Sequence, residues 1–441
     1  MYERFDGVRR TPRLPGPPYH FLSRVTEVTG EMGGLEVGSR VSIEYEIPED
    51  AWYFDDHGAG VMPFAVLLEA ALQPCGWLAS YVGSTLTSEG DLLFRNLDGE
   101  GTVKAEVLPC SGTLRTDVEL TSLSRSGSMI IESFRVRCTL GDVEVYTLDT
   151  VFGFFPPAAF ENQPGLPASE AQRALLDAEA NVHLDLRARP PRSFAGSARL
   201  SDGRLAVLDR VTYWDPTGGA EGLGALRAEK DIDAGEWFFA AHFYQDPVQP
   251  GSLGLEAMLQ ALKVAMLELG MDEEISRPRF EGLATELPHV WKYRGQVVPE
   301  NERVTTTLAI VERGRDGRGA HAIADASLWV DGKRIYEARL GMRLVEGPPP
   351  NEEAGTDDAQ PPSGGDEETL DPARDTCLGD HRPTYTRPAL PLMSMVDRMM
   401  GAARRARRAA DRLRDLTVER WVVIDGPTRL RTEIAERDGA P

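Results

Sequence analysis

The chain repeats one sequence pattern twice, and this duplication constrains its fold more than any other feature. The repeated motifs occur in the same order at a nearly constant offset of 185 to 187 residues. They are Arg24-Val-Thr26 and Arg210-Val-Thr212, Trp52-Tyr-Phe-Asp-Asp-His57 and Trp237-Phe-Phe-Ala-Ala-His242, and Pro63 with Glu69 and Pro250 with Glu256. An ordered series of this kind indicates a tandem duplication, in which each copy forms one structural unit.

Each copy predicts the same order of elements. Two strands come first, expected at His20–Thr29 and Arg40–Ile47 in one copy and at Leu205–Trp214 and Leu223–Ile232 in the other. A proline then opens a helix of about 20 residues, Pro63–Val82 or Pro250–Leu269, because proline suits a first helical turn. The second helix is apolar nearly all round, which is typical of a buried helix. Long β-hairpins follow, so we predict an α+β double hotdog: two tandem folds, each an antiparallel sheet wrapped round a central helix.

The composition along the chain divides it further. We expect a first hotdog over residues 1–160, a linker with one short helix over 161–195, and a second hotdog over 196–346. Residues 347–376 are acidic and rich in proline and glycine, with few large apolar side chains, which predicts a disordered linker. The last segment, 377–441, is expected to be a tail or the start of a further hotdog-like unit, with an opening strand at Arg387–Arg398.

Charge and composition exclude several functions. The 48 Lys and Arg against 70 Asp and Glu give a net charge of −22, which disfavours nucleic-acid binding. No apolar run reaches the ~18–20 residues that a membrane span needs, and the N-terminus lacks the apolar core of a signal peptide. The four cysteines are far apart and form no CxxC pair, so neither a zinc site nor a disulfide framework is indicated. We therefore predict a cytoplasmic protein that binds no membrane and no metal.

The second copy contains a long motif that resembles a known family. It runs His242-Phe-Tyr-Gln-Asp-Pro-Val-Gln-Pro-Gly-Ser-Leu-Gly-Leu-Glu256. The pattern is similar to the 3-hydroxyacyl-acyl-carrier-protein dehydratases of bacterial fatty acid synthesis, including the 3-hydroxydecanoyl dehydratase/isomerase. These enzymes have a His-Phe, an Asp/Asn-Pro, a Pro-Gly that starts the central helix, and an acid fourteen residues after the histidine. The resemblance covers nearly all of residues 203–345, and the tandem arrangement resembles the dehydratase region of polyunsaturated fatty acid synthases.

The resemblance implies a reaction and its partners. The reaction is dehydration of 3-hydroxyacyl chains to trans-2-enoyl chains on an acyl carrier protein, in fatty acid or polyketide synthesis, without a cofactor. The implied partners are the acyl carrier protein and other synthase domains, with a homodimer also conceivable. Imidazole is a suitable base near neutral pH, and a carboxyl on an apolar helix keeps its proton because desolvation raises its pKa. The amide groups at a helix N-terminus can stabilise the enolate oxygen.

In the family, the histidine comes from one hotdog and the acid from the central helix of its neighbour. Carried over to this chain, the resemblance implies a site with His242 and Glu69 as catalytic residues. Its implied substrate-binding residues are Phe243, Pro250 and Gly251. A second site would combine His57 with Glu256.

The first copy departs from the motif, so the second site is expected to be degraded. Its loop after His57 is two residues shorter, and Phe64 replaces the glycine that opens the helix. A pairing of His242 with Glu256 inside one copy remains open, because a separation of fourteen residues does not fix the distance between side chains.

Alternative functions remain open from the sequence. One is a hotdog acyl-thioesterase, which would use a carboxylate to activate water. Another is a non-catalytic pseudo-dehydratase that serves as a scaffold in a large synthase. Isomerisation of the double bond also stays open, because relatives with isomerase activity carry Asp at the helix acid, whereas both copies here carry Glu.

Overall fold

The structure is a computed structural model, and it describes residues 8–86, 88–348, 366–371, 390, 392–405, 424 and 427–432. The chain divides into two compact units, Met1–Pro349 and Pro350–Pro441. The first unit contains both sequence copies. In the described part, no helix is long and apolar enough to cross a membrane.

Both copies form the same fold, in the order that the sequence predicts. The first copy comprises β1 (Arg24–Thr29), β2 (Arg40–Glu46), α1 (Trp52–His57), α2 (Phe64–Val82), β3 (Leu93–Val103), β4 (Thr113–Ser126), β5 (Met129–Leu140) and β6 (Val143–Phe155). The second copy comprises β8 (Arg210–Asp215), β9 (Ala225–Asp231), α5 (Trp237–Ala241), α6 (Gly251–Glu268), β10 (Pro278–Phe280), β11 (Pro288–Tyr293), β12 (Arg303–Asp316), β13 (Gly319–Val330) and β14 (Lys333–Glu346). Each is a long helix packed on antiparallel strands, so the double hotdog is confirmed.

The two sheets join edge to edge. Within the described residues they form one fourteen-stranded sheet. Thirteen of its strands follow the path β1-β2-β4-β5-β6-β3-β11-β14-β13-β12-β9-β8-β7, where β7 is Leu184–Asp185, and β10 pairs with β14 beside this path. The join is the antiparallel pair β3 and β11, which runs from Pro288 opposite Thr102 to Lys292 opposite Asp98. Gly99 is required there, because a Cβ atom at this position would lie 2.1 Å from the Trp291 ring.

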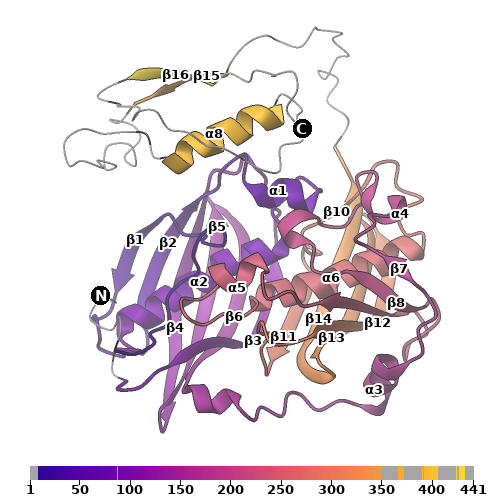
Figure 1. Cartoon of the computed structure of the whole chain (residues 1–441), viewed down its shortest axis with the longest axis horizontal. Coiled ribbons are helices and arrows are strands. Elements are labelled where there is room, and N and C mark those ends of the chain that lie inside the picture. Colours follow the sequence, from indigo (N-terminus) through magenta and orange to yellow (C-terminus); the bar gives the residue numbers. More distant parts are fainter. Residues whose placement is uncertain are drawn as a thin grey trace. The chain divides into compact units, whose positions relative to one another are not determined.

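The central helices α2 and α6 lie side by side against the joined sheet (Figure 1). Pro63 and Pro250 are their N-cap residues, one position before the first helical residue. Both helices are buried on almost all sides, which explains why their sequences lack a polar face. Because the helices touch, side chains of one copy reach the helix of the other, and this contact positions the site.

The segment expected as a linker over residues 161–195 packs against the second copy. It contains α3 (Glu170–Asp177), the short strand β7 (Leu184–Asp185), which pairs with β8, and α4 (Pro191–Phe194). The backbone of this segment is held by arginines: Arg334 donates to Pro167 O at 2.6 Å, and Arg227 donates to Leu176 O at 2.6 Å. The sequence predicted only one of these helices, since β7 and α4 are too short to leave a periodic pattern.

Two expectations for the C-terminal unit are wrong where the structure describes it. Asp366–Leu370, inside the segment expected to be disordered, forms strand β15 and pairs with β16 (Thr428–Thr432), a partner too distant in sequence to be anticipated. Residues 349–365 and 372–376 of that segment lie outside the described residues. We expected a strand at Arg387–Arg398, but from Leu392 on this range belongs to helix α8 (Leu392–Arg405). The apolar residues of α8 follow a helical spacing of three and four. A further hotdog-like unit over 377–441 stays a prediction.

Candidate active site

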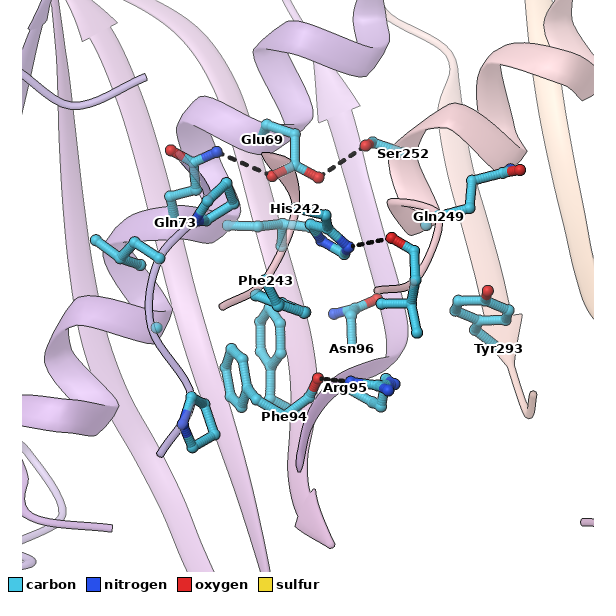
Figure 2. Close-up of a pocket in the computed structure, with 18 of the residues that line it drawn as sticks. Glu69, Gln73, Phe94, Arg95, Asn96, His242, Phe243, Gln249, Ser252 and Tyr293 are labelled. Atoms are coloured by element: carbon cyan, nitrogen blue, oxygen red, sulfur yellow. Dashed lines mark hydrogen bonds between the residues drawn. The ribbon is translucent and has the colours of Figure 1, made fainter. Parts of the chain in front are cut away.

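A pocket lies at the contact between the two copies (Figure 2). Helix α2 of the first copy forms one wall, with Glu69 and Gln73. The loop after α5 and the first residues of α6 form another wall, with His242, Phe243 and Gly251. The structure therefore brings the sequence-predicted residues His242, Phe243, Gly251 and Glu69 into one pocket, and the pocket requires both copies.

His242 follows α5 and lies almost fully buried, with 7% of its surface exposed. Its Nδ1 is 3.0 Å from the carbonyl oxygen of Val248. A carbonyl can only accept, so Nδ1 carries the proton and the lone pair of Nε2 is available as a base. Burial lowers the pKa of His242 to about 3, so the ring is neutral near pH 7.

Glu69 points its carboxyl group into the contact between α2 and α6, where 5% of the residue is exposed. The Ser252 hydroxyl donates to Oε1 at 2.7 Å, and the Gln73 amide donates to Oε2 at 3.0 Å, as Figure 2 shows. Burial raises the pKa of Glu69, and the two hydrogen bonds, which favour the charged form, only partly offset that increase. Glu69 thus holds its proton at a higher pH than an exposed glutamate does.

Gly251 is the first residue of α6, after the N-cap Pro250. A Cβ atom at Gly251 would make ordinary contacts, 3.4 Å from the Tyr293 ring and 3.8 Å from the Tyr336 hydroxyl. The fold therefore tolerates more than glycine here, and the benefit of glycine is the open approach to the amide groups at the helix start. Amide groups at a helix start can donate hydrogen bonds to an oxygen that gains negative charge. Pro250 is buried and caps the helix instead of lining the pocket.

A cross-copy ion pair fixes the loop that follows His242. Arg95 on β3 donates through Nη1 to Asp246 Oδ2 at 2.5 Å and through Nη2 to Oδ1 at 2.8 Å. The side chains are 7% and 13% exposed, and such bidentate pairs are both strong and geometrically specific. The conformation of the His242 loop therefore depends on the first copy as well as on the second.

The mirrored position, at His57, is arranged differently. His57 Nδ1 is 3.1 Å from Val61 O, but its Nε2 is 3.1 Å from Nζ of Lys263 on α6. The lysine can donate to this nitrogen in either charge state, so the lone pair that is free in His242 is occupied in His57. Burial, and then the neighbouring Lys263, lower the pKa of His57 well below its usual range, and burial also lowers the pKa of Lys263.

Glu256 has partners of its own within the second copy. Its Oε1 accepts hydrogen bonds from Ser201 Oγ and from Gln260 Nε2, both at 2.8 Å. Phe64, which replaces the helix-opening glycine, lines a small pocket whose described lining contains neither His57 nor Glu256. Neither member of the mirrored pair therefore lines the pocket at Phe64.

Comparison with known proteins assigns the family. The model of the FabA-like domain matches this chain twice, over residues 14–149 and 200–339, which are the two structural copies. The chain belongs to the FabA-like family. The FabA-like match starts at Leu14 in one copy and Leu200 in the other, the same offset of 186 that the repeats show.

The relatives include one large curated protein, a polyunsaturated fatty acid synthase component of Thraustochytrium sp. (strain ATCC 26185 / S-3). Over 327 residues the chain is 31% identical to it. The match covers 69% of this chain and 22% of that protein, so the chain spans about a fifth of its relative's length.

Two solved structures are also similar. The dehydratase domain from the CurJ module of curacin polyketide synthase is 12% identical, with a TM-score of 0.43, over 74% of this chain and 97% of that one. The bifunctional dehydratase-cyclase domain of ambruticin biosynthesis is 17% identical, with a TM-score of 0.41, over 75% and 96%.

Three residues with a part in this arrangement were not anticipated from the sequence: Ser252 and Tyr19 beside Glu69, and Lys263 at the mirrored His57. Ser252 links Glu69 to Tyr19, whose hydroxyl is 2.9 Å from Ser252 Oγ. Since Ser252 donates its proton to Glu69, Tyr19 donates to Ser252. Aligning the two copies could have found two of them, because Ser252 corresponds to Ala65 and Lys263 to Gly76. No sequence signal distinguishes Tyr19.

Proposed function

We propose that the chain dehydrates 3-hydroxyacyl thioesters to trans-2-enoyl thioesters while the acyl chain is attached to an acyl carrier protein. The observation that carries this proposal is a neutral imidazole with an available Nε2 and a carboxyl with a raised pKa in one pocket. One group can remove a proton and the other can supply one, which is what elimination of water from a 3-hydroxyacyl chain requires.

In the proposed reaction, His242 Nε2 removes the proton α to the thioester carbonyl. The negative charge that develops on the carbonyl oxygen is stabilised by the amide at Gly251 and the positive end of α6. The bond from the β carbon to the hydroxyl oxygen then breaks, its electrons go to that oxygen, and Glu69 gives the oxygen its proton. Water leaves, and transfer of the proton from His242 back to Glu69 restores both groups.

The relative's name and length support a place within a larger synthase. A chain that matches 22% of a polyunsaturated fatty acid synthase component would act on intermediates that other synthase domains produce, delivered by the carrier protein. One chain supplies both halves of the proposed site, so the proposal does not require a homodimer.

Incubation with a 3-hydroxyacyl-pantetheine thioester tests the proposal. We expect enoyl absorbance to rise, with one water lost per product molecule by mass spectrometry and no free thiol released. Free thiol with the 3-hydroxy acid as product would identify a thioesterase instead, and binding without turnover would identify a scaffold. Analysis of the double-bond position in the product shows whether isomerisation follows.

The activity should fall at alkaline pH, and replacement of Ser252 should shift that fall. Glu69 must carry a proton to act as the acid, so kcat/KM is expected to decrease as the pH rises through its pKa. The Ser252 hydrogen bond favours the charged carboxylate and lowers the pKa of Glu69. Ser252→Ala should therefore raise that pKa and move the alkaline decrease to higher pH, in a profile measured between about pH 5 and 9.

Ala65→Ser is the matched control for this experiment. Ala65 is the counterpart of Ser252 on the other central helix, so this change should leave the alkaline decrease where it is. An alkaline decrease that stays in place in Ser252→Ala, or moves to lower pH, would contradict the assignment of Glu69 as the acid.

A further inference from the structure

The pocket continues from Glu69 along one face of α2. The helix residues that line it are Leu68, Leu72, Gly76 and Ser80, each four positions after the last. Residues at this spacing lie on the same side of a helix, so the pocket follows the helix axis. The facing wall is aromatic: the Phe94 ring stacks on Phe152 and lies tilted against Phe154, with a centroid distance of 4.6 Å in both pairs. This end of the pocket has the character of a hydrocarbon-binding channel.

Gly76 packs tightly against Leu14 and Phe94, two other residues that line the pocket. A Cβ atom there would lie 3.2 Å from Leu14 Cδ2 and 3.3 Å from Phe94 Cε1, closer than ordinary contact. Gly76 is inside α2, where glycine destabilises a helix relative to alanine. A side chain at this position would have to displace Leu14 or Phe94, and because both line the pocket, their displacement would narrow the channel.

The second copy shows what happens when this position carries a side chain. Leu14 and Phe94 correspond to Leu200 and Phe280, both buried, so these two positions keep the same residue types. The residue that corresponds to Gly76 is Lys263. Its Nζ lies 5.6 Å from the Phe280 ring centroid and 3.1 Å from His57 Nε2, and 1% of the residue is exposed. The Lys263 side chain thus occupies the space between Phe280 and His57.

We propose that Gly76 sets the length of acyl chain that the His242 site accepts, and that Lys263 closes the mirrored channel. This inference rests on the proposed function for the identity of the ligand, and it names the substrate class as chains long enough to pass Gly76. Gly76 lies seven residues after Glu69, a rise of about 10 Å, or roughly eight carbon atoms of an extended chain. Shorter chains end before Gly76, whereas longer chains extend along the channel past it.

Variants at Gly76 test this with two substrates, 3-hydroxybutanoyl- and 3-hydroxydodecanoyl-pantetheine. Gly76→Leu should lower the kcat/KM ratio of the twelve-carbon to the four-carbon substrate at least tenfold, and Gly76→Ala should give a smaller decrease in the same direction. Gly90→Leu is the matched control, since a Cβ atom at Gly90 would meet nothing within 4 Å, and its ratio should equal that of the unmodified chain. An equal loss for both substrates in both Gly76 variants would overturn the inference.

Gly76→Lys transfers the second copy's residue into the first. Its amine should reach His242 Nε2 as Lys263 reaches His57, so turnover of both substrates should fall at least a hundredfold. Turnover of the long substrate at the unmodified rate would show that a lysine at this position does not close the channel.

Binding of saturated acyl-pantetheine probes separates failure of this inference from failure of the proposed function. By calorimetry, Gly76→Leu should weaken binding of the dodecanoyl probe at least tenfold relative to the butanoyl probe. If the unmodified chain shows no dehydration but Gly76→Leu selectively weakens dodecanoyl binding, the acyl channel is supported and the dehydratase function is rejected. If the chain dehydrates its substrate but Gly76→Leu weakens binding of both probes equally or not at all, the dehydratase function is supported and the role of Gly76 is rejected.

Discussion

Substitution of His242 by alanine is expected to lower the dehydration rate by about 10²–10⁴-fold, the usual contribution of a positioned acid or base. The available lone pair on Nε2 is the reason, because Nδ1 is committed to the carbonyl oxygen of Val248. Enoyl absorbance with a 3-hydroxyacyl thioester measures the effect. Thermal unfolding of the variant should show that the loss does not come from an unfolded chain.

The matched control for this variant is His57→Gln. Its amide oxygen can still accept a hydrogen bond from Lys263, so the change avoids leaving a buried amine without a partner. We expect it to change the rate by less than about tenfold, since the mirrored base is already occupied by the lysine. Equal losses in the His242 and His57 variants would show that the first copy's histidine also serves a working site.

Glu69→Gln is expected to lower the rate by about 10²–10⁴-fold, because glutamine cannot supply the proton that the leaving hydroxyl needs. The substitution keeps the size of the side chain, and its amide can still bond to Ser252 and Gln73. A rate loss with little change in thermal stability is therefore the expected combination. The long and short substrates should be affected alike, which distinguishes this variant from those at Gly76.

Glu256→Gln is the matched control for the acid. Glu256 accepts hydrogen bonds from Ser201 and Gln260 and is not among the described residues that line the His242 pocket. Its replacement should slow the reaction at least an order of magnitude less than that of Glu69. If Glu256→Gln proves the damaging change and Glu69→Gln is nearly silent, the second copy works alone and the cross-copy pairing is wrong.

Local patterns predicted most of the fold correctly. The proline before each central helix and the apolar helix sequence each act over a few residues, so they could be read directly. The expected strand at Arg387–Arg398 was wrong from Leu392 on, where apolar residues at spacings of three and four form a helix. The prediction of disorder was also wrong at Asp366–Leu370, where pairing with Thr428–Thr432 supplies backbone hydrogen bonds that no local pattern reveals.

The sequence by itself determined the duplication, the two hotdog folds and the residue types of the proposed site. It left open whether His242 is served by Glu69 or Glu256, because each lies on a buried helix of the same kind. Only the tertiary structure decided which carboxyl shares the pocket, through the packing of α2 against α6 and the hydrogen bond from Ser252 to Glu69, 183 residues apart. The contact between Lys263 and His57 spans 206 residues and was decided in the same way. Such contacts depend on how the two central helices pack on the joined sheet. The spacing of two residues along the chain does not encode the distance between their side chains in the folded protein.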